Sequence, residues 1–195
     1  ELVAGLRSTA GHSTLVLADT NSSRLGAGGK RGGVEEVVAE YRTSTQGHWL
    51  EARHDGWRRR HGFDHLRRLW LSPDGADLRG EDRLIPARAT LPHLRRDKLP
   101  VAIRFHLGPN AQATLTQDGK GALILLDGGP RQPDIAWAFR ASFNHAPGIL
   151  AIEPSLHIDS EGATHEIRQI LLTTLAEPGE PADISWSLKR QGARR

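Results

Sequence analysis

The sequence predicts an all-β fold, an antiparallel two-sheet β-sandwich of about eleven strands. Three observations support this fold class. Short apolar or alternating segments recur about every 10 residues along the chain, as they do in β-sandwiches. Turn-forming residues separate these segments, and clear helical periodicity is scarce. Because the 195 residues show neither an internal repeat nor a linker, we expect residues 1–195 to form one domain.

The expected strands are defined by their apolar or alternating residues. In chain order they are Ser13–Ala18, Trp49–His54, His65–Leu71, Asp77–Ile85, Leu99–Leu107, Ala111–Gln117, Ala122–Asp127, Ile135–Ala141, Ile149–Ile152, His165–Thr173 and Ile184–Lys189. Two of the turns between them carry specific signals. Pro73–Gly75 reads Pro-Asp-Gly, and Asp118–Gly121 contains two glycines that suit a hairpin.

The segment Val34–Tyr41 fits two patterns. Its valines and Tyr41 have the i, i+3, i+4, i+7 spacing of a helix, whereas alternate positions from Val37 onward fit a strand. We favour a strand because the neighbouring segments are β. The glycine-rich segment Arg24–Gly33 and the segment Pro86–Pro100 are expected to be loops.

The composition is that of a folded globular domain. Lys and Arg total 26 and Asp and Glu total 23, which gives a formal net charge of +3. The longest apolar runs, such as Ala122–Leu126, are strand-sized, so we expect no membrane span. The absence of cysteine excludes disulfides, cysteine-based zinc sites and a thiol nucleophile. Because the chain lacks methionine and begins at Glu1 without a signal-peptide pattern, we expect it to be a piece of a longer protein.

Motifs of several common enzyme classes are absent, including glycine-rich nucleotide loops, HExxH and GxSxG. Basic residues are concentrated between Glu51 and Trp70, where six arginines and three histidines accompany three acidic residues. Within this window Arg58, Arg59 and Arg60 follow one another and could bind oxyanions, with a solvated surface as the alternative. No nucleic-acid recognition motif accompanies them, so we expect no nucleic-acid partner.

A set of seven segments carries a family resemblance. In chain order they are Arg7–Leu15, His54–Trp57, His65–Arg68, Gly80–Asp82, Arg104–Pro109, Ile152–Ser155 and Arg168–Ile170. Together they resemble the C-terminal β-sandwich region of the heparinase II/III-like polysaccharide lyases. In that family an α/α-toroid domain precedes the sandwich, so the resemblance implies a missing N-terminal toroid as the partner of this chain.

The resemblance implies cleavage of acidic polysaccharide by β-elimination, in which a uronate loses its C5 proton and the glycosidic oxygen at C4 leaves. In the family a Tyr and an Asn or His of the toroid act together with a His of the sandwich. The matching position here is His12, which would act as a base or as a charged stabiliser because imidazole titrates near neutrality. A half-buried histidine bonded to the backbone is the alternative. Tyr41, the only tyrosine, is not assigned the role of catalytic acid.

Side-chain chemistry suggests which residues would hold such a substrate. Arg58, Arg59 and Arg60 would bind its carboxylates or sulfates, since guanidinium groups hold such oxyanions bidentately, with a solvated loop as the alternative. Trp57 would stack on a sugar ring, and Trp49 is the other tryptophan that we expect to be exposed enough to do so, with burial in the core as the alternative for the tryptophans.

Some family members also hold a structural zinc ion with His and Asp residues of the sandwich. The candidates in this chain are His54 and Asp19, with Asn21 and His106 behind them. Zinc with nitrogen and oxygen ligands is chemically sound. The alternative for His54 is an outward-facing strand residue beside a tight turn at Asp55–Gly56.

Two functions stay open at this point. The first is the C-terminal domain of a uronate-polysaccharide lyase, which alone would be inactive. The second is a non-catalytic module that binds acidic glycans. The region upstream of Glu1 would distinguish them, because only a lyase needs a toroid with its own catalytic residues. Many relatives are bacterial and exported, so the resemblance implies the periplasm or cell envelope, with the cytoplasm as the alternative.

Overall fold

A computed structural model describes residues 5–26, 29–30, 32–87, 97–131 and 133–192. Within them the chain forms two antiparallel sheets, of eight and four strands, and a separate two-stranded hairpin. This confirms the predicted all-β sandwich, with twelve strands in its two sheets instead of about eleven. No helix in these residues is long and apolar enough to cross a membrane.

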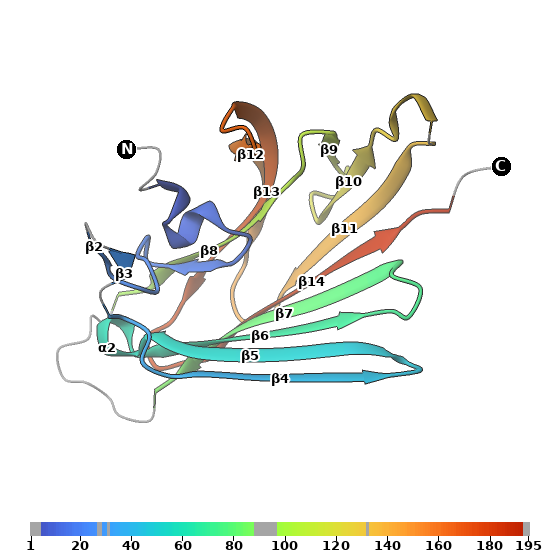
Figure 1. The fold of residues 1–195 in the computed structure, drawn as a ribbon. Coiled ribbons are helices and arrows are strands. Elements are labelled where there is room, and N and C mark those ends of the chain that lie inside the picture. Colours follow the sequence, from blue (N-terminus) through green and yellow to red (C-terminus); the bar gives the residue numbers. More distant parts are fainter. Residues whose placement is uncertain (1–4, 27–28, 31, 88–96, 132, 193–195) are drawn as a thin grey trace.

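The larger sheet combines strands from the middle and the end of the chain (Figure 1). Across the sheet the order is β4 (Val37–Ser44), β5 (Gly47–Trp57), β6 (Phe63–Leu71), β7 (Asp77–Pro86), β14 (Ala182–Arg190), β11 (Ile135–Phe143), β10 (Gly121–Leu126) and β9 (Ala111–Leu115). The last strand of the chain, β14, therefore lies at the centre of this sheet, between β7 and β11.

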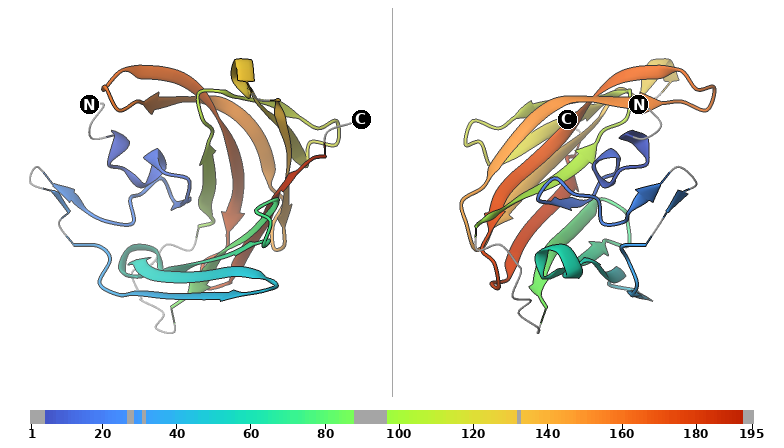
Figure 2. Two further views of the ribbon diagram at one scale, coloured as in Figure 1. Left: turned by 45° about the vertical axis from the view of Figure 1, so that its right-hand side comes forward. Right: turned by 90° about the vertical axis from the view of Figure 1, so that its left-hand side faces the viewer.

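The smaller sheet lies across the larger one. Its order is β1 (Leu15–Leu17), β8 (Leu99–His106), β13 (Thr164–Ala176) and β12 (Ile149–Ile158). The remaining elements are short: η1 (Thr9–Gly11), β2 (Leu25–Gly26), β3 (Gly29–Lys30), α2 (Arg58–His61) and η2 (Gly129–Arg131). Figure 2 shows that the two sheets form a crescent, with the N-terminal segment that contains η1 and β1 on its open side.

The apolar core lies between the two sheets. Its fully buried members come from both of them: Leu15, Leu17, Val101, Ile103, Ile170 and Leu172 from the smaller sheet, and Phe63, Leu84 and Ile184 from the larger. Phe105 of β8 packs edge-on against Trp186 of β14, with the ring centroids 4.8 Å apart. Because burial of a large apolar side chain contributes about 1.5–3 kcal/mol, this interface is what holds the two sheets together.

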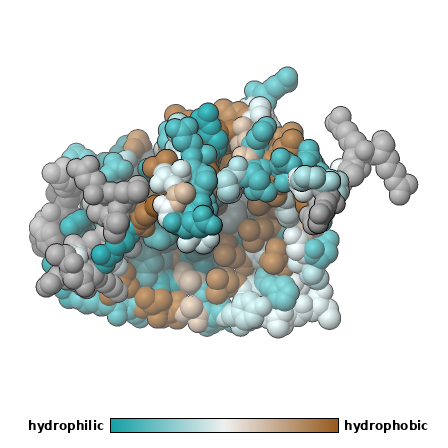
Figure 3. Space-filling model, turned by 45° about the horizontal axis from the view of Figure 1, so that its top comes forward, coloured by the Kyte–Doolittle hydropathy of each residue, from teal (hydrophilic) through white to brown (hydrophobic). Residues whose placement is uncertain are grey.

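Other apolar side chains remain exposed. They include Val37, Val38 and Tyr41 of β4 and Leu50 of β5. All eight residues of β4 are exposed, since this edge strand is covered on neither face. In the space-filling view, apolar groups gather in the hollow at the middle of the molecule and along its lower border, between hydrophilic groups (Figure 3).

The strand predicted within Val34–Tyr41 is confirmed as β4, which begins at Val37. The two predicted turns are also confirmed. Gly75 and Gly119 adopt positive φ angles of 68° and 65°, which glycine tolerates best. Gly75 donates a backbone hydrogen bond to Ser72, and the turn of Gly119 joins β9 to β10.

The two predicted loops differ in outcome. Arg24–Gly33 is not a loop throughout, because β2 and β3 pair within it as a short antiparallel hairpin. Glycine-rich sequence carries little strand signal, but the backbone can still pair when two short stretches meet. Pro86–Pro100 lies mostly outside the described residues. Its last two residues, from Leu99, already belong to β8.

Candidate functional site

His12 lies on the short segment that connects η1 to β1. Its backbone is extended, with φ −125° and ψ 155°, and its side chain is exposed. The predicted strand Ser13–Ala18 is shorter in the structure, where only β1, Leu15–Leu17, is paired, and all three of its residues are buried. Gly11 is needed just before His12, because a Cβ atom there would lie 2.9 Å from the carbonyl oxygen of Gly5. The imidazole of His12 is thus held at the surface beside a fixed strand.

His106, at the end of β8, fixes this segment from the smaller sheet. Its Nε2–H donates to the carbonyl oxygen of Ala10 over 3.1 Å, and its backbone N–H donates to Ser13 Oγ over 3.0 Å. Its Nδ1 then accepts from Ser155 Oγ, 2.8 Å away. Burial lowers the pKa of His106, and the nearby charges of Arg104 and His12 lower it further. His106 therefore binds the chain both before and after His12, at Ala10 and at Ser13.

A buried carboxylate fixes the same segment from the larger sheet. Asp82 has no exposed surface, and Arg67 donates to both of its oxygens, from Nε over 2.8 Å and from Nη2 over 2.9 Å. Trp186 Nε1 adds a third hydrogen bond to Asp82, of 2.9 Å, and His65 Nε2 a fourth, of 2.7 Å. Burial by itself would raise the pKa of Asp82, but the hydrogen bond from His65 and the charge of Arg67 outweigh it and lower this pKa to about 2.

Arg67 has one nitrogen left, Nη1, and it donates to the carbonyl oxygen of Ser13 over 2.6 Å. Ser13 directly follows His12, so the Asp82–Arg67 pair holds the backbone beside the candidate catalytic side chain. His106 and Arg67 come from different sheets. The position of His12 thus depends on the packing of the two sheets.

His54 is connected through His65 to the buried carboxylate of Asp82. The backbone N–H of Gly56 donates to His54 Nδ1 over 3.1 Å, and His54 Nε2 lies 3.2 Å from His65 Nδ1. If His65 Nε2–H donates to Asp82, then His65 Nδ1 accepts from His54 Nε2–H, and His54 Nδ1 accepts from Gly56. The hydrogen bonds thus run in one direction, from Gly56 through the two imidazoles to Asp82. Burial lowers the pKa of His54 to about 4, with His65 as the next cause.

The two predicted zinc ligands have different surroundings in the structure. Both ring nitrogens of His54 are engaged in hydrogen bonds, whereas Asp19 is exposed in the turn that follows β1. Among the residues that the structure describes, no three His, Asp or Glu side chains gather in a way that could hold a metal ion. Zinc at His54 and Asp19 stays a prediction, and this arrangement of His54 does not favour it.

Trp57 is buried, although the sequence predicts that it is exposed. Only 1% of its surface is accessible, and its Nε1–H donates to the carbonyl oxygen of Thr20 over 3.3 Å. The pairing of β5 with β6 shifts its register between His54 and Trp57, and this irregularity turns the indole into the core. A ring buried on both faces offers no surface on which a sugar could stack.

The predicted basic strip divides into two parts. Arg58 donates to both oxygens of the buried Asp64, from Nε over 2.7 Å and from Nη2 over 2.8 Å, so it has a structural partner. Arg59 is 80% exposed, with Glu35 as its ion-pair partner at 2.8 Å, and Arg60 is exposed as well. The helical turn α2 carries these two side chains outward. Arg59 and Arg60 are thus the exposed members of the strip.

Arg59 and Arg60 line a cleft of about 480 Å³, together with Asn21, Ser22, Ser23, Arg24, Gly32, Gly33, Glu35 and Gly56. Its wall is bonded to the segment that carries His12. Thr9 donates from its backbone N–H to Asn21 Oδ1 over 2.8 Å, and the backbone N–H of Ser22 donates to Thr9 Oγ1 over 3.0 Å. The basic cleft and the segment of His12 are thus parts of one surface.

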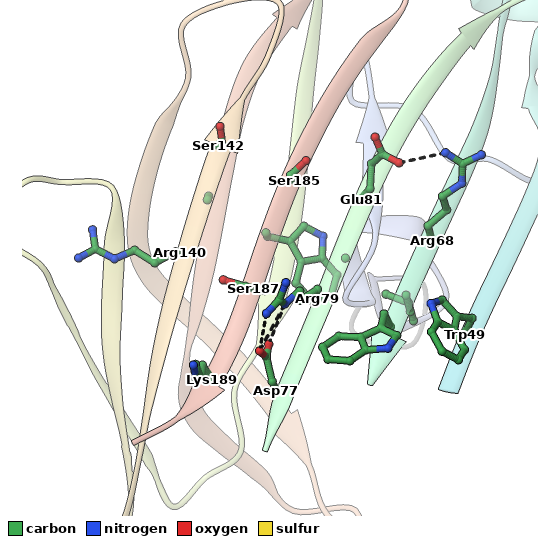
Figure 4. Close-up of a pocket in the computed structure, with 15 residues that line it drawn as sticks. Trp49, Arg68, Asp77, Arg79, Glu81, Arg140, Ser142, Ser185, Ser187 and Lys189 are labelled. Atoms are coloured by element: carbon green, nitrogen blue, oxygen red, sulfur yellow. Dashed lines mark hydrogen bonds and ion pairs between the residues drawn. The ribbon is translucent and has the colours of Figure 1, made fainter. Parts of the chain in front are cut away.

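A second cleft, of about 570 Å³, lies on the outer face of the larger sheet (Figure 4). We call it the sheet-face cleft. Its lining side chains come from β5, β6, β7, β14 and β11, and they include Trp49, Arg68, Arg79, Arg140 and Lys189. The sequence singled out Trp49 by its expected exposure, and 37% of its surface is accessible. The cleft as a whole had no signal in the sequence, because its residues are scattered over the chain.

The chain matches the family described as Heparinase II/III-like, C-terminal, over residues 1–187, and it belongs to this family. It is similar to FtsZ-localized protein C of Caulobacter vibrioides, with 38% identity over 160 residues, which are 81% of this chain and 26% of that protein. The chain thus spans about a quarter of the length of this relative.

Solved structures share the fold. Heparan sulfate lyase HepC from Pedobacter heparinus aligns with a TM-score of 0.75 at 11% identity, over 100% of this chain and 26% of that one. A crystal structure of heparinase III aligns with a TM-score of 0.70 at 12% identity, over 97% of this chain and 25% of that one. Similarity at this level of identity concerns the fold.

Proposed function

We propose that this chain is the C-terminal domain of a polysaccharide lyase that cleaves uronate-containing acidic polysaccharide by β-elimination, and that it supplies His12 to the cleft shared with an N-terminal toroid. The observation that carries the proposal is the anchoring of His12. An exposed imidazole lies on a backbone segment that Arg67 and His106 hold from both sheets. Membership of the heparinase II/III-like family supports the reaction class.

The proposed reaction needs a base, an acid and a group that stabilises the negative charge developing on the uronate carboxylate. A base takes the C5 proton of the uronate, the electron pair of that C–H bond forms the C4=C5 double bond, and the C4–O bond breaks. An acid returns a proton to the leaving oxygen. The imidazole of His12 can take the C5 proton or, when charged, stabilise the negative charge that develops on the carboxylate. The toroid would supply the other proton-transfer group.

The surroundings of His12 suit this role. Because burial lowers the pKa of the neighbouring His106, the ring of His106 places no positive charge beside His12 at neutral pH. Its two ring nitrogens are also engaged with Ala10 and Ser155, which leaves His12 as the exposed imidazole of this pair.

Arg59 and Arg60 would bind the carboxylates of the polysaccharide. They line the cleft whose wall is bonded to Thr9, three positions before His12. A guanidinium group pairs well with a carboxylate and stays charged at every physiological pH. We therefore assign the two arginines to substrate binding and His12 to proton transfer.

The test is an assay of a protein extended upstream of Glu1 against a panel of uronate polysaccharides, with ultraviolet absorbance reporting the new C4=C5 bond. His12→Ala should remove the activity while leaving the fold intact, and His157→Ala on β12 is the matched control. Full activity in His12→Ala would show that the assignment of His12 is wrong. Arg59→Gln should raise KM more than it lowers kcat, because it acts on binding.

The alternative, a non-catalytic module that binds acidic glycans, uses the same basic cleft. It predicts that the extended protein binds a uronate polysaccharide at low salt without forming any unsaturated product. Binding that is lost in Arg59→Gln, together with no product in any assay, would replace the lyase proposal with this one.

A further inference from the structure

We propose that the sheet-face cleft is a second binding site for acidic glycan, centred on Trp49 and the cations around it (Figure 4). The choice of an acidic glycan as the ligand rests on the proposed function, whereas the position rests on the cleft itself. Its volume of about 570 Å³ is within the range of roughly 300–1,000 Å³ that small-molecule sites occupy.

Two indoles form the aromatic part of the cleft. Trp49 of β5 and Trp70 of β6 are direct cross-strand partners on the outer face. The guanidinium of Arg79 lies over the ring of Trp70, 5.0 Å from its centroid, which leaves Trp49 as the more available platform. An indole presents a flat apolar face, and the C–H face of a pyranose ring can stack on such a surface.

The cleft contains one cation that has no carboxylate partner among the described residues. Four cationic side chains line it, those of Arg68, Arg79, Arg140 and Lys189. The three arginines form ion pairs, Arg68 with Glu51 and Glu81, Arg79 with Asp77, and Arg140 with Asp118. Lys189 makes no ion pair with the residues that the structure describes, so its ammonium group can meet a uronate or sulfate group directly.

The arginines keep hydrogen-bond donors for a ligand. Arg68 uses Nε on Glu51 and Nη1 on Glu81, and Arg79 uses Nε and Nη2 on Asp77. Each guanidinium has five N–H donors, and the side chains are 48% and 63% exposed, so donors remain that face solvent. Arginines already fixed by a carboxylate lose little further rotamer freedom when they bind an oxyanion.

Serine hydroxyls supply neutral partners next to these cations. Ser185 and Ser187 alternate with the buried Trp186 along β14, and therefore they face away from the core, into the cleft. Neither hydroxyl has a side-chain hydrogen bond within the described part of the chain. Hydroxyls of this kind can exchange hydrogen bonds with the hydroxyls of a sugar.

The sheet-face cleft is separated from His12 by the larger sheet. Arg67 and Arg68 are neighbours on β6, but Arg67 bonds to the buried Asp82 and to Ser13, whereas Arg68 lines the cleft. A glycan bound in the cleft is thus outside the proposed reaction centre. We infer that the cleft holds the polysaccharide at a distance from the bond that is cleaved.

The experiment is a calorimetric titration of the 195-residue chain with heparin, polygalacturonate and alginate oligosaccharides at low salt, with dextran as the uncharged control. At least one acidic glycan should bind, and dextran should not. Trp49→Ala and Arg79→Gln should each raise Kd about tenfold or more, as expected for a central contact. Trp49→Tyr should retain most of the affinity. Lys98→Gln, which removes one cation next to the smaller sheet, should change Kd less than about twofold.

The outcomes separate this inference from the proposed function. Affinity that is unchanged in both Trp49→Ala and Arg79→Gln, or equal binding of dextran, would overturn the inference whatever the lyase assay gives. Absence of binding to all three acidic glycans would also overturn it and leave this face to a protein partner. Binding that depends on Trp49 but yields no unsaturated product would keep the inference while the lyase proposal fails. Circular dichroism of each variant shows that a loss of affinity is not a loss of fold.

Discussion

Arg67 donates a hydrogen bond from Nη1 to the carbonyl oxygen of Ser13, 2.6 Å away and 54 positions earlier in the chain. Its other two nitrogens are bound to the carboxylate of Asp82, which has no exposed surface. One buried charge thus fixes the guanidinium, and the guanidinium fixes the backbone next to His12. The proposed catalytic side chain owes its position to a residue of the opposite sheet.

Arg67→Lys tests this relationship. A lysine keeps the charge near Asp82, but it cannot bind both carboxylate oxygens and the carbonyl of Ser13 together. We expect the free energy of unfolding to fall by about 3 kcal/mol, since a buried charge loses part of its partner. In a urea titration Arg59→Lys, at an exposed position, serves as the control and should change stability by less than about 0.5 kcal/mol. Equal stability of the two variants would show that the Asp82–Arg67 pair is not needed for the fold.

His54 should make the stability depend on pH. Its pKa is about 4 in the folded chain and 6.5 ordinarily, so the unfolded chain binds more protons between these values. Stability should therefore fall as the pH is lowered from about 6.5 through about 4, by about 3 kcal/mol from this group. His54→Gln should flatten that part of the curve of urea midpoint against pH, and His157→Gln should not. An unchanged slope in His54→Gln would mean that other groups cause the dependence.

Gly80 should tolerate no side chain. A Cβ atom there would lie 2.2 Å from Cζ2 of Trp186, whose indole also donates to Asp82. We expect Gly80→Ala to cost about 3 kcal/mol and to lower Tm by about 6–12 °C in a thermal melt. Gly192→Ala, where a Cβ atom meets nothing within 4 Å, is the matched control. A Tm for Gly80→Ala close to that of the control would contradict this account of the packing.

Trp57 and Trp49 should respond in opposite ways to truncation. Trp57 is 1% exposed within the core, so Trp57→Ala should destabilise the fold by about 3–5 kcal/mol. Trp49 is 37% exposed, and Trp49→Ala should cost less than about 1 kcal/mol while it weakens glycan binding. Chemical denaturation of both variants, run beside the glycan titration, checks this division. A large stability loss in Trp49→Ala would instead make that indole part of the fold.

Most of the fold could be predicted because period-two alternation and turn residues are local signals. The hairpin of β2 and β3 had no such signal, since glycines carry no side-chain pattern. Trp57 was misassigned because Asp55–Gly56 resembles a turn in sequence. In the structure the strand continues through it, and Asp55 instead accepts backbone hydrogen bonds from Glu35 and Glu36.

The site was less predictable than the fold. The segments of His12, Arg67, Asp82 and His106 each belong to the set that carries the family resemblance. Their contacts could not be predicted, since they join residues up to 104 positions apart through the packing of the strands. The sheet-face cleft is a surface of single residues from five strands, and no linear motif describes it.

Arg67 and Arg68 are neighbours on β6 and point to opposite faces of the sheet, so both proposed sites depend on the same pairing register of β6 with β7. Deleting a single residue upstream of them in β6 would exchange their faces, so that Arg67 would point to solvent and Arg68 toward the buried carboxylate of Asp82. The hydrogen bond from Arg67 to Ser13 and the contribution of Arg68 to the sheet-face cleft would then be lost together. The two proposed sites therefore both require the present length of β6, Phe63–Leu71.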